Sequence, residues 1–340
     1  MNPEIIITNI KKRYTGVSGT INALLPIQSI SLKVGYLGSP IPGATIAESN
    51  KGNFKKLSLL KSISISMTRL RDGRKRIWHV RRDHEMILAI LLRDFLRLPI
   101  LIVFTSAAKH QHSWFPSWLI KKMDGVISTT PEAASFIPNT LLVVPHGISL
   151  KRFSPPPNKM VAWEKTGLPG KYGIGTFGRV RPDKGTDIYI DAMLELLPDF
   201  PEFTAIVAGL CQPQHQKYKD SLLKRISDKG LTNRIVFIGE ITASEVGEWY
   251  QNVLITVACP RYEPFGLTPL EGMACECAIV ASETGAFKTI VNENITGFII
   301  PTDNSHELTV ALRKLMENPS KAYQMGKMGR NRVKEFFSIE

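Results

Sequence analysis

The sequence predicts an α/β protein built from two doubly wound, Rossmann-like domains. Short apolar runs of strand length alternate with helical stretches throughout the chain, which is typical of parallel-sheet α/β domains. The length of 340 residues corresponds to two domains of roughly 150 residues each. Three prolines at 155–157 lack N–H donors and interrupt the alternation once. We therefore expect an N-terminal domain over 1–153, a linker over 154–160 and a C-terminal domain over 161–340.

The elements of each domain are predicted by the apolar runs and the amphipathic stretches between them. The strands are expected near residues 4–10, 32–37, 77–81, 100–104, 125–128 and 141–144, then 172–177, 203–208, 235–238, 254–258, 278–281 and 297–300. The clearest helices are expected near 84–96, 115–122, 185–197, 214–229, 243–252, 267–275, 305–317 and 320–337. Ligands bind at the carboxyl ends of parallel strands, so we expect the two domains to face each other across a cleft.

Composition indicates a cytoplasmic protein. The longest apolar runs, 87–92 and 98–104, are far shorter than the ~18 residues of a membrane-spanning helix. The first residues lack the basic segment of a signal peptide. The four cysteines form no CxxC pair, so we expect buried thiols in a reducing compartment and no metal site.

The excess of positive charge lies entirely in the front half of the chain. Residues 1–153 hold 22 Lys and Arg against 8 Asp and Glu, a net charge of +14, whereas residues 154–340 have a net charge of −1. Such a field attracts nucleic acid, an anionic membrane leaflet or a polyanionic substrate. The most basic segment, 51–82, contains only two aromatic residues, Phe54 and Trp78, which disfavours binding of single-stranded nucleic acid.

One glycine motif is rejected as a dinucleotide fingerprint. Residues 173–178 read Gly-Ile-Gly-Thr-Phe-Gly, which matches GxGxxG. That motif needs a strand before its first glycine and a helix that opens at its last. Here the preceding stretch 165–171 is rich in turn residues, and the glycines lie inside the predicted strand.

The turn that follows this strand predicts an anion site. Gly178 and Arg179 come directly after the strand, and Lys184 and Gly185 precede the next helix. Arginine binds phosphate bidentately, lysine supplies a point charge, and a helix N-terminus adds partial positive charge. Together these groups are suited to a diphosphate.

A second constellation follows the strand at 254–258. Glu263 and Glu271 are eight residues apart, separated by a Pro-Phe-Gly turn and the start of a helix. Carboxylates bind the vicinal diols of sugars. We expect the backbone N–H groups of the intervening residues to bind hydroxyl or phosphate oxygens; these are Phe265, Gly266, Leu267 and Thr268.

These two strings closely resemble those of the retaining group 1 (family 4) glycosyltransferases of the GT-B fold. The resemblance is strong over about 170–335 and looser over the front half. It implies a nucleotide-sugar donor held mainly by the rear domain without a metal. It assigns the diphosphate to Arg179 and Lys184, the ribose hydroxyls to Glu271 and the transferred hexose to Glu263 and the amides after it. Arg179, Lys184 and Glu263 are then the expected catalytic residues, and Gly178 contacts the donor.

Two features depart from the family pattern. Many members carry Gly-Gly-x-Pro-Glu after the next strand, where this sequence reads Gly-Ala-Phe-Lys-Thr at 285–289. Thr289 therefore stands where the family has a glutamate. The chain stops at Glu340, and the family's last helix often returns to the first domain, so we expect that this crossover helix is truncated.

The front domain resembles the lipopolysaccharide-core mannosyltransferases, which use GDP-mannose and act on the Kdo sugar of lipid A precursors. The resemblance rests on the loop at 14–20 and on the strings at 78–86, 104–113 and 145–148. The loop at Gly16 is expected to present amides to the donor. The acceptor-side candidates are Arg81, Arg82, His110, His112 and His146. The basic domain would then bind an anionic glycolipid acceptor and rest on the inner face of the cytoplasmic membrane.

The resemblance implies front-face transfer of a hexose with retention, driven by electrostatic stabilisation of the leaving diphosphate. Two alternatives keep the fold: a nucleotide-sugar epimerase, which needs no acceptor, and a phosphorylase, which holds a lysine-bound pyridoxal cofactor. The third alternative is a basic nucleic-acid-binding protein.

Overall fold

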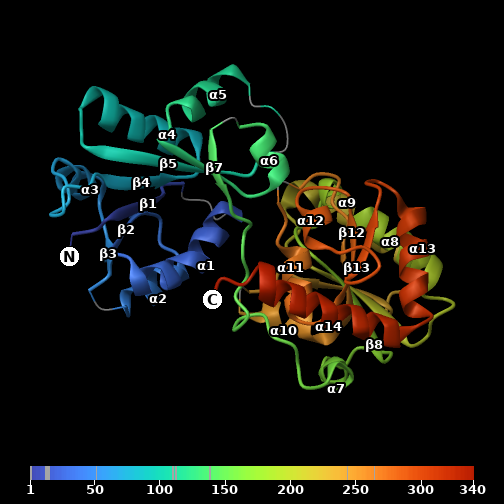
Figure 1. The fold of residues 1–340 in the computed structure, drawn as a ribbon. Coiled ribbons are helices and arrows are strands. Elements are labelled where there is room, and N and C mark those ends of the chain that lie inside the picture. The colour runs from blue at the N-terminus through green and yellow to red at the C-terminus, as the bar shows by residue number, and fades with distance from the viewer. Residues whose placement is uncertain are drawn as a thin grey trace. The chain divides into compact units, whose positions relative to one another are not determined.

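A computed structural model describes residues 2–11, 16–50, 52–108, 111, 113–137, 139–242, 244–263 and 265–340. The chain divides into two compact units (Figure 1). The front unit comprises residues 1–147 with 339–340, and the rear unit comprises residues 148–338.

In the described residues of the front unit, seven parallel strands form one sheet in the order β3-β2-β1-β4-β5-β6-β7. The strands are β1 (Ile5–Asn9), β2 (Val34–Gly38), β3 (Phe54–Lys56), β4 (Arg76–Val80), β5 (Ile100–Ser106), β6 (Gly125–Ser128) and β7 (Thr140–Val143). The helices are α1 (Gly16–Ser31), α2 (Pro42–Glu48), α3 (Leu59–Ser66), α4 (Asp83–Ile90) with a π-helical turn at Leu91–Phe95, α5 (Trp114–Lys121) and α6 (Pro131–Ser135). Helices α1 and α2 share one core cluster with β1 and β2, whereas α4 and α5 bury their apolar sides in another.

The described rear unit repeats this architecture with six parallel strands in the order β10-β9-β8-β11-β12-β13. The strands are β8 (Tyr172–Phe177), β9 (Phe203–Ala208), β10 (Ile235–Gly239), β11 (Val253–Ala258), β12 (Ala278–Ser282) and β13 (Gly297–Ile300). The helices are α7 (Lys159–Glu164), α8 (Thr186–Leu196), α9 (Gln216–Asp228), α10 (Glu245–Asn252), α11 (Thr268–Ala274), α12 (Phe287–Ile290), α13 (Ser305–Met316) and α14 (Pro319–Phe336). One core lies against α8, α9 and α13, the other against α10, α11 and α14.

The division between the units differs from the expected linker at 154–160. The rear unit starts at Ile148, because Ile148 and Phe153 are buried in its core. Just beyond the prolines, Lys159 begins α7, and its buried Nζ donates a hydrogen bond to the carbonyl oxygen of Val253 at 2.8 Å. The proline segment is therefore part of the rear unit.

In both sheets the chain order reverses beside the first strand, between β1 and β4 and between β8 and β11. In open parallel sheets such switch points are where ligands bind, at the carboxyl ends of the strands. The two rear strings of the sequence follow β8 and β11 directly. Throughout the described chain, no helix combines the length and the apolar character needed to cross a bilayer.

Candidate active site

The turn from Gly178 to Gly185 joins β8 to α8. Gly178 has a φ of 149°, and its N–H donates to the carbonyl oxygen of Ala208 at 2.9 Å. Gly185 has a φ of 70°, and a Cβ at this position would lie 2.0 Å from the carbonyl oxygen of Cys259. Because only glycine allows this approach, the start of α8 packs directly on the chain that leaves β11. The turn thus brings Lys184 to the end of β11.

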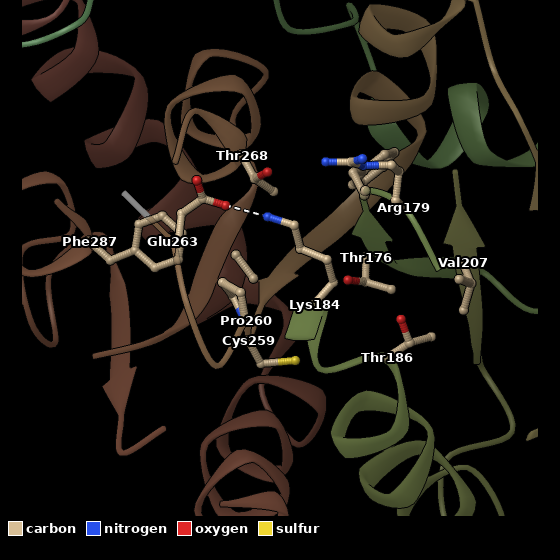
Figure 2. Close-up of a pocket in the computed structure, with 13 residues that line it drawn as sticks. Thr176, Arg179, Lys184, Thr186, Val207, Cys259, Pro260, Glu263, Thr268 and Phe287 are labelled. Carbon is tan, nitrogen blue, oxygen red and sulfur yellow. Dashed lines mark hydrogen bonds and ion pairs between the residues drawn. The ribbon is translucent and has the colours of Figure 1, made fainter. Parts of the chain in front are cut away.

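Lys184 and Glu263 form an ion pair where the two loops meet. The distance between Lys184 Nζ and Glu263 Oε2 is 2.6 Å, and both side chains are partly buried. Figure 2 shows the lysine reaching toward the carboxylate, with Arg179 on the other side of the lysine. An ammonium group has three N–H donors, so Lys184 can bind Glu263 and an anion at the same time.

A pocket surrounds this ion pair and is built from the ends of β8 and β11 and the starts of α8, α11 and α12. Its described lining residues are Thr176, Phe177, Gly178, Arg179, Lys184, Thr186, Val207, Ala258, Cys259, Pro260, Glu263, Thr268 and Phe287. Five of the residues expected from the sequence therefore come together here: Gly178, Arg179, Lys184, Glu263 and Thr268. The side chains of Phe265, Leu267 and Glu271 do not line it.

The loop after Glu263 holds backbone donors beside the pocket. Gly266 has a φ of 84°, and a Cβ there would lie 2.2 Å from Phe287 Cε1. Among the described residues, no acceptor is found for the N–H groups of Gly266, Leu267 and Thr268. Binding of ligand oxygens by these N–H groups and by that of Phe265 stays a prediction. The carbonyl oxygen of Phe265, which is buried, accepts a hydrogen bond from Ala286 N at 3.0 Å.

Glu271 does not line the pocket and accepts a hydrogen bond from a tyrosine. Tyr250, which is fully buried, donates its hydroxyl to Glu271 Oε2 at 2.8 Å and stacks on Phe177 at a ring-centroid distance of 3.9 Å. Burial raises the pKa of the Glu271 carboxyl, against the opposing effects of the Tyr250 hydrogen bond and the charge of Arg152. The assignment of Glu271 to the ribose hydroxyls stays a prediction.

Arg261, in the loop after β11, forms hydrogen bonds and ion pairs with the turn between β8 and α8 and with the start of α8. The sequence alone did not indicate this role of Arg261. Its guanidinium donates to both carboxylate oxygens of Asp187, at 2.9 and 2.8 Å, and to Asp303 Oδ1 at 2.9 Å. Its N–H also binds the carbonyl oxygen of Asp183 at 2.9 Å. Burial alone would raise the pKa of Asp187, but the hydrogen bonds from Arg261 and Tyr218 lower it. Asp187 therefore stays ionised and keeps α8 docked on the β11 loop.

The segment 285–289, which departs from the family pattern, still packs its backbone against the loop at Phe265. It lacks the glutamate side chain that many family members have there. Gly285 has a φ of 57°, and a Cβ there would lie 2.7 Å from the carbonyl oxygen of Phe265. Thr289 is exposed on α12, while its neighbour Lys288 pairs with Glu283 at 2.5 Å. No glutamate from this segment thus enters the pocket.

In the front unit, Arg82 is part of a buried network. Its Nη1 donates to Asn9 Oδ1 at 2.9 Å and to Glu85 Oε1 at 3.1 Å, and Nη2 donates to Ser18 Oγ at 3.2 Å. Glu85 also accepts from the backbone N–H of Ile10 at 3.2 Å. Arg82 therefore connects the end of β1 to α1, which begins at Gly16; a role of either residue toward substrate stays a prediction.

Arg81 and His146 lie near each other in the same unit. Burial lowers the pKa of Arg81 to about 10, and its Nε and Nη1 have no partner among the described residues. Burial, reinforced by the charge of Arg81, lowers the pKa of His146 to about 4, so the imidazole is neutral at pH 7. The two other histidine candidates, His110 and His112, lie outside the described residues. The acceptor-side assignments stay predictions.

No group of three His, Cys, Asp or Glu able to hold a metal ion is found in the part of the chain that the structure describes. Burial raises the pKa of the Cys259 thiol, at the pocket wall, to about 12. This cysteine is protonated at neutral pH and unsuited to act as a nucleophile.

Comparisons with known proteins identify the family. The family described as glycosyl transferases group 1 matches residues 164–332. The lipopolysaccharide core biosynthesis mannosyltransferase LpcC of Rhizobium leguminosarum bv. viciae is 37% identical over 99% of this chain and 93% of its own. The chain belongs to the group 1 glycosyltransferases. The core biosynthesis mannosyltransferase LpsB of Rhizobium meliloti (strain 1021) is 39% identical over 99% of this chain and 94% of its own.

Group 1 membership establishes the protein as a glycosyltransferase and confirms the expected fold class, two Rossmann-like domains of the GT-B type. The crystal structure of Anabaena Alr3699/HepE in complex with UDP covers 99% of this chain and 96% of its own with a TM-score of 0.81. At 16% identity this likeness concerns the fold alone.

Proposed function

We propose that this glycosyltransferase transfers mannose from GDP-mannose, with retention, to an inner-core acceptor such as Kdo-lipid A. Two relatives that match nearly the whole chain are named lipopolysaccharide core biosynthesis mannosyltransferases. The observation that carries the proposal is the Lys184–Glu263 pair at the β8/β11 switch point, with Arg179 in the same pocket.

In this proposal the pocket acts on the two sides of the bond that breaks. Lys184 and Arg179 stabilise the negative charge that develops on the leaving diphosphate, and they are pre-positioned, so no reorganisation is needed during the reaction. Glu263 binds hydroxyl groups of the transferred hexose, and its contact with Lys184 sets the distance between sugar and diphosphate. Glu271 binds the ribose.

Retention follows from front-face attack. Glu263, the carboxylate that lines the described pocket, is already engaged by an ammonium group, which lowers its value as a nucleophile. The acceptor hydroxyl then attacks the anomeric carbon from the side of the departing phosphate, and the phosphate oxygen takes the hydroxyl proton. No metal is required, because the cations of the pocket neutralise the diphosphate.

The front unit is proposed to supply the acceptor site. Its residues, 1–147 with 339–340, hold 20 Lys and Arg against 9 Asp and Glu, a net charge of +11. This charge attracts carboxylates and phosphates of an anionic glycolipid and the anionic inner face of the cytoplasmic membrane. Arg81 remains charged at neutral pH, and its Nε and Nη1 lack partners in the described chain. We propose a lipid-linked sugar acid as the anion that this charge attracts, since the most basic segment, 51–82, has only two aromatic residues on which nucleic-acid bases could stack.

The test is a product assay with purified protein in EDTA. GDP-mannose, UDP-glucose, UDP-GlcNAc and ADP-heptose are each supplied with Kdo-lipid A, and the product linkage is determined by NMR. We expect transfer from GDP-mannose alone, with an α-linkage. Transfer from another donor, an inverted linkage, or turnover of donor without acceptor, as in an epimerase, would contradict the proposal.

A further inference from the structure

The outer side of α5 carries exposed aromatic rings. We define the aromatic patch as Trp114, Phe115 and Trp118. Trp114 is 79% exposed and Trp118 is 46% exposed. The rings contact one another, with centroid distances of 5.6 Å between Trp114 and Phe115 and 6.2 Å between Phe115 and Trp118.

This exposure does not result from a poorly anchored helix. Leu119 and Ile120, on the same helix, are buried in the core of the front unit. The helix therefore has an apolar side that packs inward and a second apolar side that faces outward. Large exposed apolar clusters of this kind mark interaction sites.

The neighbouring helix extends this surface. Helix α4 packs against α5, and Ile87, Leu91 and Phe95 follow one another at four-residue spacing with exposed side chains, Phe95 being 80% exposed. The ion pair between Arg93 Nη1 and Asp124 Oδ2, 2.6 Å apart, ties the π-helical turn to the residues just after α5. Figure 1 shows α4 and α5 side by side, and both carry exposed apolar side chains.

Two lysines follow the aromatic patch, while the nearby carboxylates of Asp94 and Asp124 are both paired with Arg93. Helix α5 contains no acidic residue, and Lys121 and Lys122 at its end are exposed. Lys122 Nζ lies 5.9 Å from the centroid of the Trp118 ring. Indole rings with adjacent lysines are typical of protein surfaces that lie at the headgroup level of anionic membranes.

We infer that the aromatic patch inserts into the headgroup region of an anionic phospholipid bilayer. A second copy of the chain is a poorer occupant, since both copies would bring a strongly positive front half to the contact. The inference rests on the proposed function, which places a lipid-linked acceptor at the membrane surface, and it names the surface that docks there.

The experiment measures vesicle binding and catalysis separately. Binding is measured by co-sedimentation of the full chain with phosphatidylcholine vesicles with or without 30% phosphatidylglycerol, and insertion by quenching of tryptophan fluorescence with brominated lipid. We expect the double variant Trp114→Ser/Trp118→Ser to bind anionic vesicles at least tenfold more weakly than the wild type. The control Ile30→Ser/Ile46→Ser, at exposed apolar positions of α1 and α2, should bind as the wild type does.

Activity toward a delipidated, water-soluble acceptor separates this inference from the proposed function, because we expect the Trp variant to keep it. Equal vesicle binding by variant and wild type, no binding by the wild type, or binding without preference for anionic lipid would overturn the inference. So would loss of a concentration-dependent dimer in the variant without any change in vesicle binding. Failure of the wild type to act on any mannose acceptor would instead overturn the proposed function.

Discussion

Lys184 is the residue on which the chemistry of the rear pocket depends. Its ammonium is fixed by Glu263 and by the glycine that follows it, so that its position does not depend on a flexible surface turn. A charge held in this way stabilises a transition state more effectively than the same charge in solvent, since it does not need to be reorganised.

Replacement of Lys184 by alanine should lower kcat/KM by about 10²–10³, the loss typical for one electrostatic contact to a developing anion. The matched control is Lys171→Ala, which removes an exposed lysine that is also paired at 2.6 Å, with Glu202. Its kcat/KM should stay within about twofold of the wild type, because exposed pairs contribute little. The measurement is the steady-state kcat/KM of both folded variants. A Lys184→Ala enzyme with unchanged kcat/KM would show that the lysine has no role in the mechanism.

Because burial lowers the pKa of His146, we predict that the free energy of unfolding depends on pH. Its pKa is lowered from 6.5 to about 4 in the folded chain, mainly by burial. Below pH 6.5 the unfolded chain takes up a proton that the folded chain resists, so folding loses stability as the pH falls toward 4. Between pH 7 and pH 5, the Tm of His146→Gln should fall by roughly 2–4 °C less than that of the wild type.

The control for this measurement is His306→Gln, at an exposed position of α13, whose loss of Tm should match that of the wild type. Scanning calorimetry at the two pH values gives the comparison. Parallel losses for His146→Gln and the wild type would show that His146 is not held in its neutral form.

At the scale of elements, the contact between the start of α8 and the end of β11 assembles the site. Gly185 allows this contact with a left-handed backbone and no side chain. Gly167 has the same φ of 70°, but a Cβ there would meet nothing within 4 Å. Alanine substitutions at Gly167 and Gly185 therefore distinguish the effect of backbone strain alone from the effect of strain combined with a steric clash.

Gly167→Ala should destabilise the protein by about 1–2 kcal/mol, the usual cost of a left-handed alanine, and leave catalysis unchanged. Gly185→Ala should add a clash with Cys259, shift Lys184 away from Glu263 and lower kcat/KM more than tenfold. Urea unfolding and kinetics of both variants provide the comparison. Equal catalysis by the two variants would refute the importance of this contact.

The predictability of the elements follows from their hydrophobic pattern. Continuous apolar runs, which strands buried on both faces require, predict each of the six strands that the structure describes in the rear unit. Strand β3 was missed because its three residues, Phe54–Lys56, include two exposed lysines. Lys184 and Glu263 could be proposed from local strings, but their ion pair could not, because 79 residues separate them. Arg261 was missed for the same reason, since its partners Asp187 and Asp303 lie far away in sequence.

At the scale of the molecule, the two units have the same architecture but differ in net charge. Residues 154–340 have a net charge of −1 and place two cations, Arg179 and Lys184, in the pocket, whereas residues 1–153 carry a net charge of +14. This division predicts that donor and acceptor respond differently to salt. Exposed charges are screened over about 10 Å at 0.1 M salt and about 3 Å at 1 M, whereas partly buried charges are screened less.

The KM for an anionic acceptor should therefore rise more than about fivefold between 50 mM and 500 mM NaCl, while the KM for the donor changes less than twofold. The control is an acceptor without phosphate groups, whose KM should depend less on salt. Both KM values are obtained from initial rates measured over a concentration series of the donor and of each acceptor. A salt-independent KM for the anionic acceptor would show that the basic surface does not attract it.

The central claim is that Lys184 and its pocket bind the β-phosphate of the donor nucleotide. Isothermal titration of the wild type and Lys184→Ala with GDP and GMP tests it directly, because the two ligands differ by that phosphate alone. We expect the wild type to bind GDP at least tenfold more tightly than GMP, and the variant to bind both with similar, weak affinity. An undiminished preference for GDP in Lys184→Ala would contradict the claim.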